Sequence, residues 1–111
     1  MAAVNFSAMD LLSRIKRLAL ARRIVLTRKA EEEMEADDLT ENDVIESIVN
    51  AQRIDKVLRS SSHFRIQRVE KLYVIKGFTF SNILVYTKGK IVKDGSHETF
   101  YILISSKCAT S

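Results

Sequence analysis

Apolar and polar positions divide the chain into two parts with different periods. In the first part, apolar residues recur every three to four positions, which is typical of amphipathic helices. Thr27 is placed to cap a second helix, and Thr40 with Asp43 three residues later forms a capping box before a third. The predicted helices span residues 8–21, 28–38 and 43–52, with a short extended link at 23–27.

From residue 53 onward the apolar period shortens toward two, and β-branched and aromatic residues become more frequent, so this part is predicted to form strands. The predicted strands cover residues 54–60, 64–69, 71–79, 82–92 and 98–106. The breaks between them fall at Ser60-Ser61-Ser62, Glu70, Ser81-Asn82 and Asp94-Gly95. The last of these is a strong hairpin signal.

The order of these elements predicts the fold class. Helices at the N-terminal end followed by a run of strands favour an α+β fold over a doubly wound one. We expect two or three N-terminal helices packed on a mainly antiparallel sheet of four to five strands. The length of 111 residues predicts a single domain, residues 1–111.

The net charge of +4 conceals a strong separation of charge along the chain. Residues 1–29 carry seven bases and one acid, residues 30–46 carry nine acids and no base, and residues 47–111 carry eleven bases and four acids. The acidic segment most simply forms a solvated helix surface, although it also suits a self-masking or antitoxin-facing one. The two basic segments indicate an anionic partner.

Several classes of protein are disfavoured because the chain lacks their residues. No apolar run reaches the ~20 residues of a membrane span, and no signal peptide pattern opens the chain, so we expect a cytoplasmic protein. Cys108, His63 and His97 are too few for a Cys/His zinc site. There is no glycine-rich phosphate loop, and only Asp55 and Glu70 could supply carboxylates between residues 47 and 93. We therefore expect neither a cofactor nor a metal.

Lysine, arginine and tyrosine remain abundant, and these types suffice for cleavage of RNA by its own 2′-hydroxyl group. That reaction needs a base, cations that stabilise the phosphorane charge, and an acid for the leaving 5′-oxygen. A lysine can serve as the base when neighbouring positive charge lowers its pKa from about 10.4. A tyrosine can stack on an unpaired base or donate a proton.

The strand pattern suggests where such groups meet. A regular strand places Lys71 and Tyr73 on one face and Lys76 on the other, while Tyr86 and Lys88 share a face of the next strand. We expect cationic and phenolic groups from different strands to converge on one solvent-open patch. The same pattern also suits basic residues that only keep strand edges soluble.

Four segments resemble a known family in their order and spacing. LLSRIKRLALARRIVLTRKAEEEM, DVIESI, DKVL and KLYVIKGFTFSNILVYTKGK resemble the MqsR toxins (motility quorum-sensing regulator) and related small domains in the RelE-like ribonuclease superfamily, over about residues 11–90. The resemblance implies a RelE-like fold and a metal-independent endoribonuclease that cleaves mRNA as the toxin of a toxin–antitoxin pair. It also implies a cognate antitoxin, in that family often a protein with a zinc-binding domain.

The resemblance assigns catalytic roles to four residues: Lys56, Gln67, Tyr73 and Lys88. Gln67 matches only approximately, because the intervening loop is shorter here. Residues 99–107 form a strand beyond the family pattern, which could pair with the sheet edge and cover the site.

The leading hypothesis is therefore a toxin that cleaves single-stranded mRNA. In it, Lys56 and Lys88 hold phosphate or exchange the proton, and Tyr73 stacks or acts as the acid. The residues expected to bind the RNA are Arg59, Arg65, Lys71, Lys76, Tyr86 and Lys90. The alternative is a non-catalytic RNA- or partner-binding module with the same surface. Membrane-surface binding by the basic first helix is disfavoured by its narrow apolar stripe.

Overall fold

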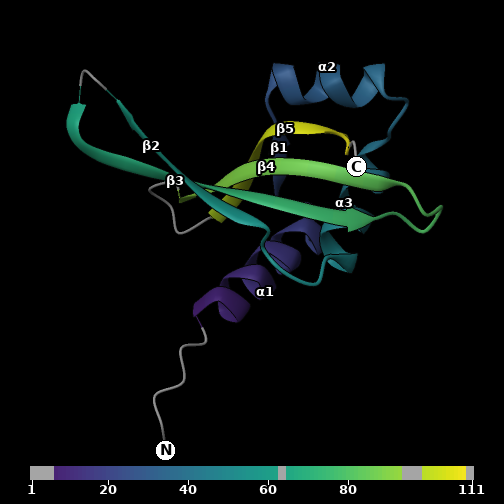
Figure 1. Ribbon diagram of the computed structural model, residues 1–111, viewed down its shortest axis with the longest axis horizontal. Coiled ribbons are helices and arrows are strands. Elements are labelled where there is room, and N and C mark those ends of the chain that lie inside the picture. The colour runs from purple at the N-terminus through teal and green to yellow at the C-terminus, as the bar shows by residue number, and fades with distance from the viewer. Residues whose placement is uncertain (1–6, 63–64, 94–98, 110–111) are drawn as a thin grey trace, which may run out of the picture.

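The computed structural model describes the backbone of residues 7–62, 65–93 and 99–109, and the side chains of residues 10–59, 70–93 and 99–109. His63, His97 and the Asp94-Gly95 turn lie outside the described residues, so the expectations for them stay predictions. The described elements are α1 (Ser7–Leu20), β1 (Ile24–Leu26), α2 (Arg28–Ala36), α3 (Glu41–Asn50), β2 (Lys56–Ser62), β3 (Arg65–Phe78), β4 (Leu84–Lys93) and β5 (Thr99–Cys108) (Figure 1).

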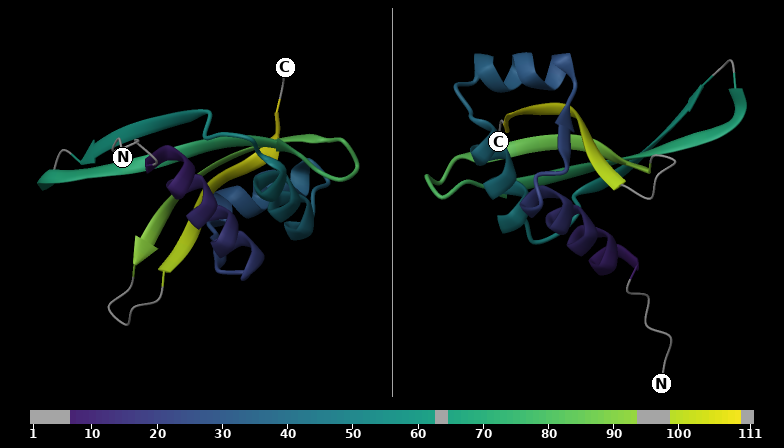
Figure 2. Two further views of the ribbon diagram at one scale, coloured as in Figure 1. Left: turned by 90° about the horizontal axis from the view of Figure 1, so that it is seen from below. Right: turned by 180° about the vertical axis from the view of Figure 1, so that it is seen from behind.

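The five described strands form one sheet in the order β1-β5-β4-β3-β2. Strands β2 to β5 pair antiparallel with their neighbours in the sequence, and β1 pairs parallel with β5. The left view of Figure 2 shows the three helices on one side of this sheet, with the long β2–β3 hairpin reaching past them. The protein therefore has the expected α+β fold, with helices packed on a mainly antiparallel sheet.

The strand prediction is wrong at two of its breaks, and the extended link forms a strand of the sheet. The extended link contributes a strand, because Ile24–Leu26 pairs with residues 101–103 of β5. Glu70 does not separate the predicted strands 64–69 and 71–79: both belong to β3, in which Glu70 is paired with Ser60 of β2. Ser60-Ser61-Ser62 is not a break either, because these residues belong to β2. A charged side chain is tolerated within a strand when its face of the sheet meets solvent.

The helix starts follow the predicted capping chemistry. The Thr27 hydroxyl accepts a hydrogen bond from the Ala30 backbone N–H at 3.2 Å, which caps α2. Thr40 and Asp43 form the reciprocal capping box of α3, at 3.1 and 2.8 Å. Among the described residues, no helix combines the length and the apolar content needed to cross a membrane.

The core lies between the helices and the sheet face that they cover. α3 packs on β3 and β4, and α1 packs on α3 and β5. Two glycines allow close approach: a Cβ on Gly77 would overlap the Ser47 carbonyl oxygen of α3, and a Cβ on Gly89 would lie 2.6 Å from the Tyr101 ring. Both positions therefore require a residue without a side chain.

Helix α2 protects the outer edge of β5 beyond the end of β1. Glu33 accepts hydrogen bonds from the Ser105 hydroxyl at 2.6 Å and the Ser106 N–H at 3.2 Å, and Asp37 accepts one from the Cys108 N–H at 2.7 Å. Side chains of α2 thus occupy backbone donors that an exposed sheet edge would offer to another chain.

Candidate nucleic-acid interface

The two faces of the sheet differ in what covers them. Tyr73, Ile75, Val85 and Leu103 point toward the helices and belong to the core cluster. Side chains of the opposite parity point away from the helices, and we call this surface the open face. Its described members include Lys56, Leu58, Glu70, Leu72, Val74, Lys76, Phe78, Leu84, Tyr86, Lys88, Lys90 and Lys107.

One row of the open face crosses three strands with two lysines. Val74 of β3 is paired with Lys56 of β2 on one side and with Lys88 of β4 on the other. Val74 is only 2% exposed, although it does not belong to the core cluster. Lysine stems commonly cover apolar neighbours in this way, while their ammonium groups stay in water.

A second row carries an aromatic ring between two lysines. Tyr86 of β4 is paired with Lys76 of β3 and with Lys107 of β5, and the Lys107 ammonium lies 5.5 Å from the centre of the Tyr86 ring. The two rows lie two residues apart along the strands, about 7 Å, so they form a continuous cationic surface with a phenol in one row.

Two lysines of this surface have acidic partners. The Lys76 ammonium lies 3.9 Å from the Asp55 carboxylate, and the Lys90 ammonium lies 2.7 Å from that of Glu70. Among the described residues, Lys56 and Lys88 form no ion pair. Their charges therefore remain available to an anionic ligand.

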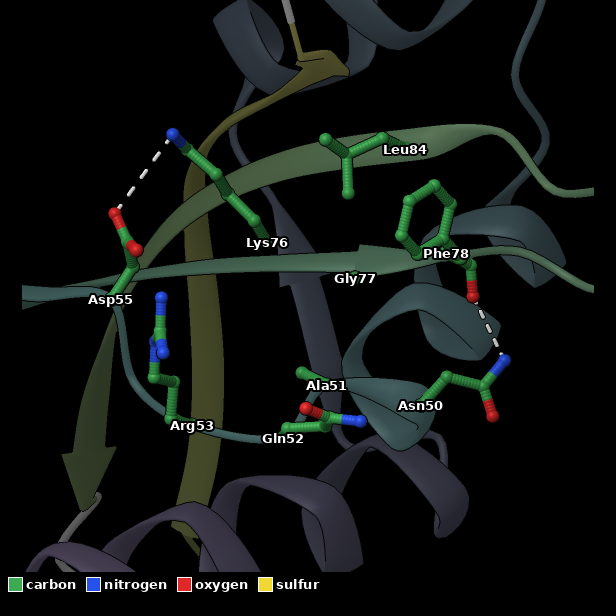
Figure 3. A pocket seen from close by; sticks show the side chains of 9 residues that line it. All are labelled: Asn50, Ala51, Gln52, Arg53, Asp55, Lys76, Gly77, Phe78 and Leu84. Atoms are coloured by element: carbon green, nitrogen blue, oxygen red, sulfur yellow. Dashed lines mark hydrogen bonds and ion pairs between the residues drawn. The ribbon is translucent and has the colours of Figure 1, made fainter. Parts of the chain in front are cut away.

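Two depressions border the open face. One, of about 420 Å³, lies beside β3 just past its pairing with β2, and it contains Arg53, Lys76 and the half-exposed ring of Phe78 (Figure 3). The other, of about 500 Å³, is lined by Asp37, Lys76, Tyr86, Lys107, Cys108 and Ala109. Lys76 lines both depressions, and each combines cationic groups with an aromatic ring.

Tyr73 and Lys88 lie on opposite faces of the sheet, so the expectation that Lys56, Tyr73 and Lys88 meet on one patch is wrong, although Lys56 and Tyr73 line a common cleft. Tyr73 is paired with Val57 and Gly89, faces the helices and is 8% exposed. The physical reason is strand parity, because Tyr73 and its neighbour Val74 must point to opposite faces. The phenol on the open face is that of Tyr86.

Other predicted residues fall on the same side as Tyr73 or outside the described side chains. Lys71 and Arg59 are paired across β2 and β3 and share the face of Tyr73. A cleft of about 400 Å³ beside α1 is lined by Lys56 together with Lys71 and Tyr73. Gln67 and Arg65 lie in the backbone of β3, but their side chains are outside the described part.

Lys107 belongs to the site, and sequence reasoning missed it. The β4–β5 register shifts between Lys88, which opposes Ser105, and Gly89, which opposes Leu103. Ile104 is therefore an additional residue in β5, and Lys107 is turned to the open face. The C-terminal strand, for which covering the site was one possibility, lies within the sheet between β1 and β4 and enlarges this face. The only sequence signal was a lysine near the end of an apolar strand.

Cys108 lines the second depression as a thiol. Burial raises its pKa, and so do the negative charges of Asp37 and Asp43, so the sulfur stays protonated and a weak nucleophile. In the described part of the chain, no three acidic, histidine or cysteine side chains gather closely enough to hold a metal ion.

Comparison with family models, curated proteins and solved structures finds no match to this chain.

Proposed function

We propose that the open face binds single-stranded RNA. The observation that carries the proposal is the pair of cross-strand rows on the sheet face that none of the described helices covers. In one row Lys76 and Lys107 flank Tyr86, and in the other Lys56 and Lys88 flank Val74. Lysines at this spacing provide a track for a phosphate backbone, and an aromatic ring among them provides a platform on which a base can stack.

The two depressions support this function over simple surface charge. Each places an aromatic ring beside cations, and Lys76 stands between them. Two consecutive bases could occupy the depressions while Lys76 exchanges its ion pair with Asp55 for the phosphate that joins them. A duplex keeps its bases stacked inside, so it could use the lysines but not the rings.

The test compares fluorescently labelled octauridine with an RNA duplex of equal phosphate number, by anisotropy at several salt concentrations. We expect octauridine to bind more tightly, with a log–log salt slope of about −2 to −3 for four phosphate contacts. Equal binding of the duplex would mean that the rings do not stack on bases. Absence of binding at low salt would refute the proposal.

Metal-independent RNA cleavage is a second candidate, favoured by one observation. Lys56 and Lys88 lie on either side of Val74 and carry no ion pair among the described residues, so two ammonium groups could hold the charge that develops on a phosphorane. Because Tyr73 lies on the other face, the phenol that could stack or act as the acid is that of Tyr86. In this proposal the protein is the RelE-like toxin of a toxin–antitoxin pair, with an antitoxin as partner.

Incubation with single-stranded RNA in EDTA separates cleavage from binding alone. A ribonuclease of this kind leaves cyclic-phosphate or 3′-phosphate ends, and Lys88→Ala abolishes cutting while the fold is retained. Intact RNA after prolonged incubation with a protein that binds it would leave the non-catalytic module as the function. Growth arrest on expression, reversed by Lys88→Ala, would support the toxin assignment.

A further inference from the structure

The second depression contains an acid that RNA binding alone does not explain. Asp37, the C-cap residue that follows α2, lies in it beside Lys76, Tyr86 and Lys107. A carboxylate repels phosphate, so an acid among these lysines weakens a purely electrostatic track. It can instead accept hydrogen bonds from a ligand that is itself held by the cations.

The Asp37 carboxylate is held in position. One of its oxygens, Oδ2, accepts the Cys108 backbone N–H at 2.7 Å, which ties the end of α2 to the end of β5. An ionised carboxylate has about four acceptor positions, so this bond leaves most of its capacity open. The depression thus presents a fixed acceptor pair near an aromatic ring.

We propose that this depression binds a guanine base of the RNA through its Watson–Crick edge; the inference rests on the RNA binding proposed above. Guanine is the common base that presents two adjacent donors, N1–H and the N2 amino group, and these match the two oxygens of a carboxylate. Adenine and cytosine present one donor beside an acceptor, and uracil presents one donor between two acceptors.

The neighbouring groups complete the recognition of guanine. Its O6 atom is an acceptor next to N1–H, and the ammonium of Lys76 or Lys107 supplies a donor at the same depression. The Tyr86 ring, in the centre of its row, offers a surface for the base. The volume of about 500 Å³ lies within the usual range of small-ligand sites.

The test uses octauridines that carry one central guanosine, inosine or adenosine, measured by anisotropy against the full chain. Inosine lacks only the N2 amino group, so it removes one of the two donors. We expect guanosine to bind roughly 5- to 150-fold more tightly than adenosine, as for other bidentate base contacts, with inosine between them.

Asp37→Asn should abolish the preference for guanosine, because the amide replaces one acceptor with a donor. Asp38→Asn is the matched control: it makes the same change of charge at the next residue, which is exposed, and it should keep the preference. Thermal denaturation of both variants checks that the fold survives.

Equal binding of the three oligonucleotides would overturn the guanine site while leaving RNA binding intact. So would an unchanged preference in Asp37→Asn, which would limit Asp37 to holding the Cys108 N–H. Failure of all three to bind would overturn the RNA-binding function and the guanine site with it.

Discussion

Tyr73 and Tyr86 lie on neighbouring strands, and their side chains show how the two faces of one sheet differ in burial and in role. Tyr73 is buried against the helices, where its ring contributes to the core. Tyr86 lies on the open face between Lys76 and Lys107. The tyrosine on one face thus stabilises the core, and the tyrosine on the other face belongs to a candidate binding site. The position of each residue in the alternation of its strand determines which face its side chain occupies.

The largest expected effect comes from removing the buried member of the pair. Tyr73→Ala should lower the free energy of unfolding by about 3–5 kcal/mol, as for other large aromatic side chains in cores. Urea denaturation measures it. The control is Tyr86→Ala, which should cost far less because its ring is only partly buried. Equal losses of unfolding free energy in the two variants would mean that Tyr73 contributes no more to the core than Tyr86 does.

Adjacent positions of β3 give a second comparison. Gly77→Ala should destabilise the fold by about 1–3 kcal/mol, because the added methyl group must displace α3 at Ser47. Lys76→Ala, one residue away on the open face, should cost less than about 1 kcal/mol, the worth of an exposed ion pair. Thermal unfolding measures which of the two variants is destabilised more. A larger destabilisation by Lys76→Ala would contradict the assignment of Gly77 to the covered face and Lys76 to the open face.

The open face should respond in binding rather than in stability. Tyr86→Ala should weaken octauridine binding by about 1–3 kcal/mol, the usual worth of one stacked base. Tyr86→Phe keeps the ring and should bind like the wild type, whereas loss of cleavage in Tyr86→Phe would show that the hydroxyl is needed for chemistry. Binding that survives Tyr86→Ala undiminished would remove the stacking platform.

The smallest expected effect concerns the edge where α2 meets β5. Burial tends to raise the pKa of Glu33, but the hydrogen bonds from Ser105 and Ser106, with the charges of Lys29 and Lys107, lower it below its ordinary value of 4.5. The ionised Glu33 carboxylate therefore stabilises the fold at pH values above 4.5, and this contribution is lost as the pH falls through the lowered pKa.

Glu33→Gln should flatten this part of the acid denaturation profile, measured by circular dichroism between neutral pH and pH ~3. Glu32→Gln, one residue away and mostly exposed, is the control and should leave the profile unchanged. An unaltered acid slope in Glu33→Gln would contradict the assigned role.

Local chemistry explains what the sequence could predict. Capping residues such as Thr27 and Thr40 determine helix starts, and alternation correctly placed Lys71 with Tyr73 and Tyr86 with Lys88. Alternation does not say which face the helices cover, because β3 has apolar residues on both. The β5 bulge that turns Lys107 outward depends on pairing with β4, which no local pattern encodes.

The most direct test of the open face uses two charge-matched double variants. Lys56→Gln/Lys88→Gln removes two cations from the open face, and Arg14→Gln/Arg17→Gln removes two exposed cations from α1. The salt dependence of octauridine binding is measured for both. We expect the log–log slope of the lysine variant to shrink by about 1.4, or 0.7 per lost phosphate contact, and that of the arginine variant to stay unchanged. The reverse result, or an equal loss in both, would contradict RNA binding by the open face.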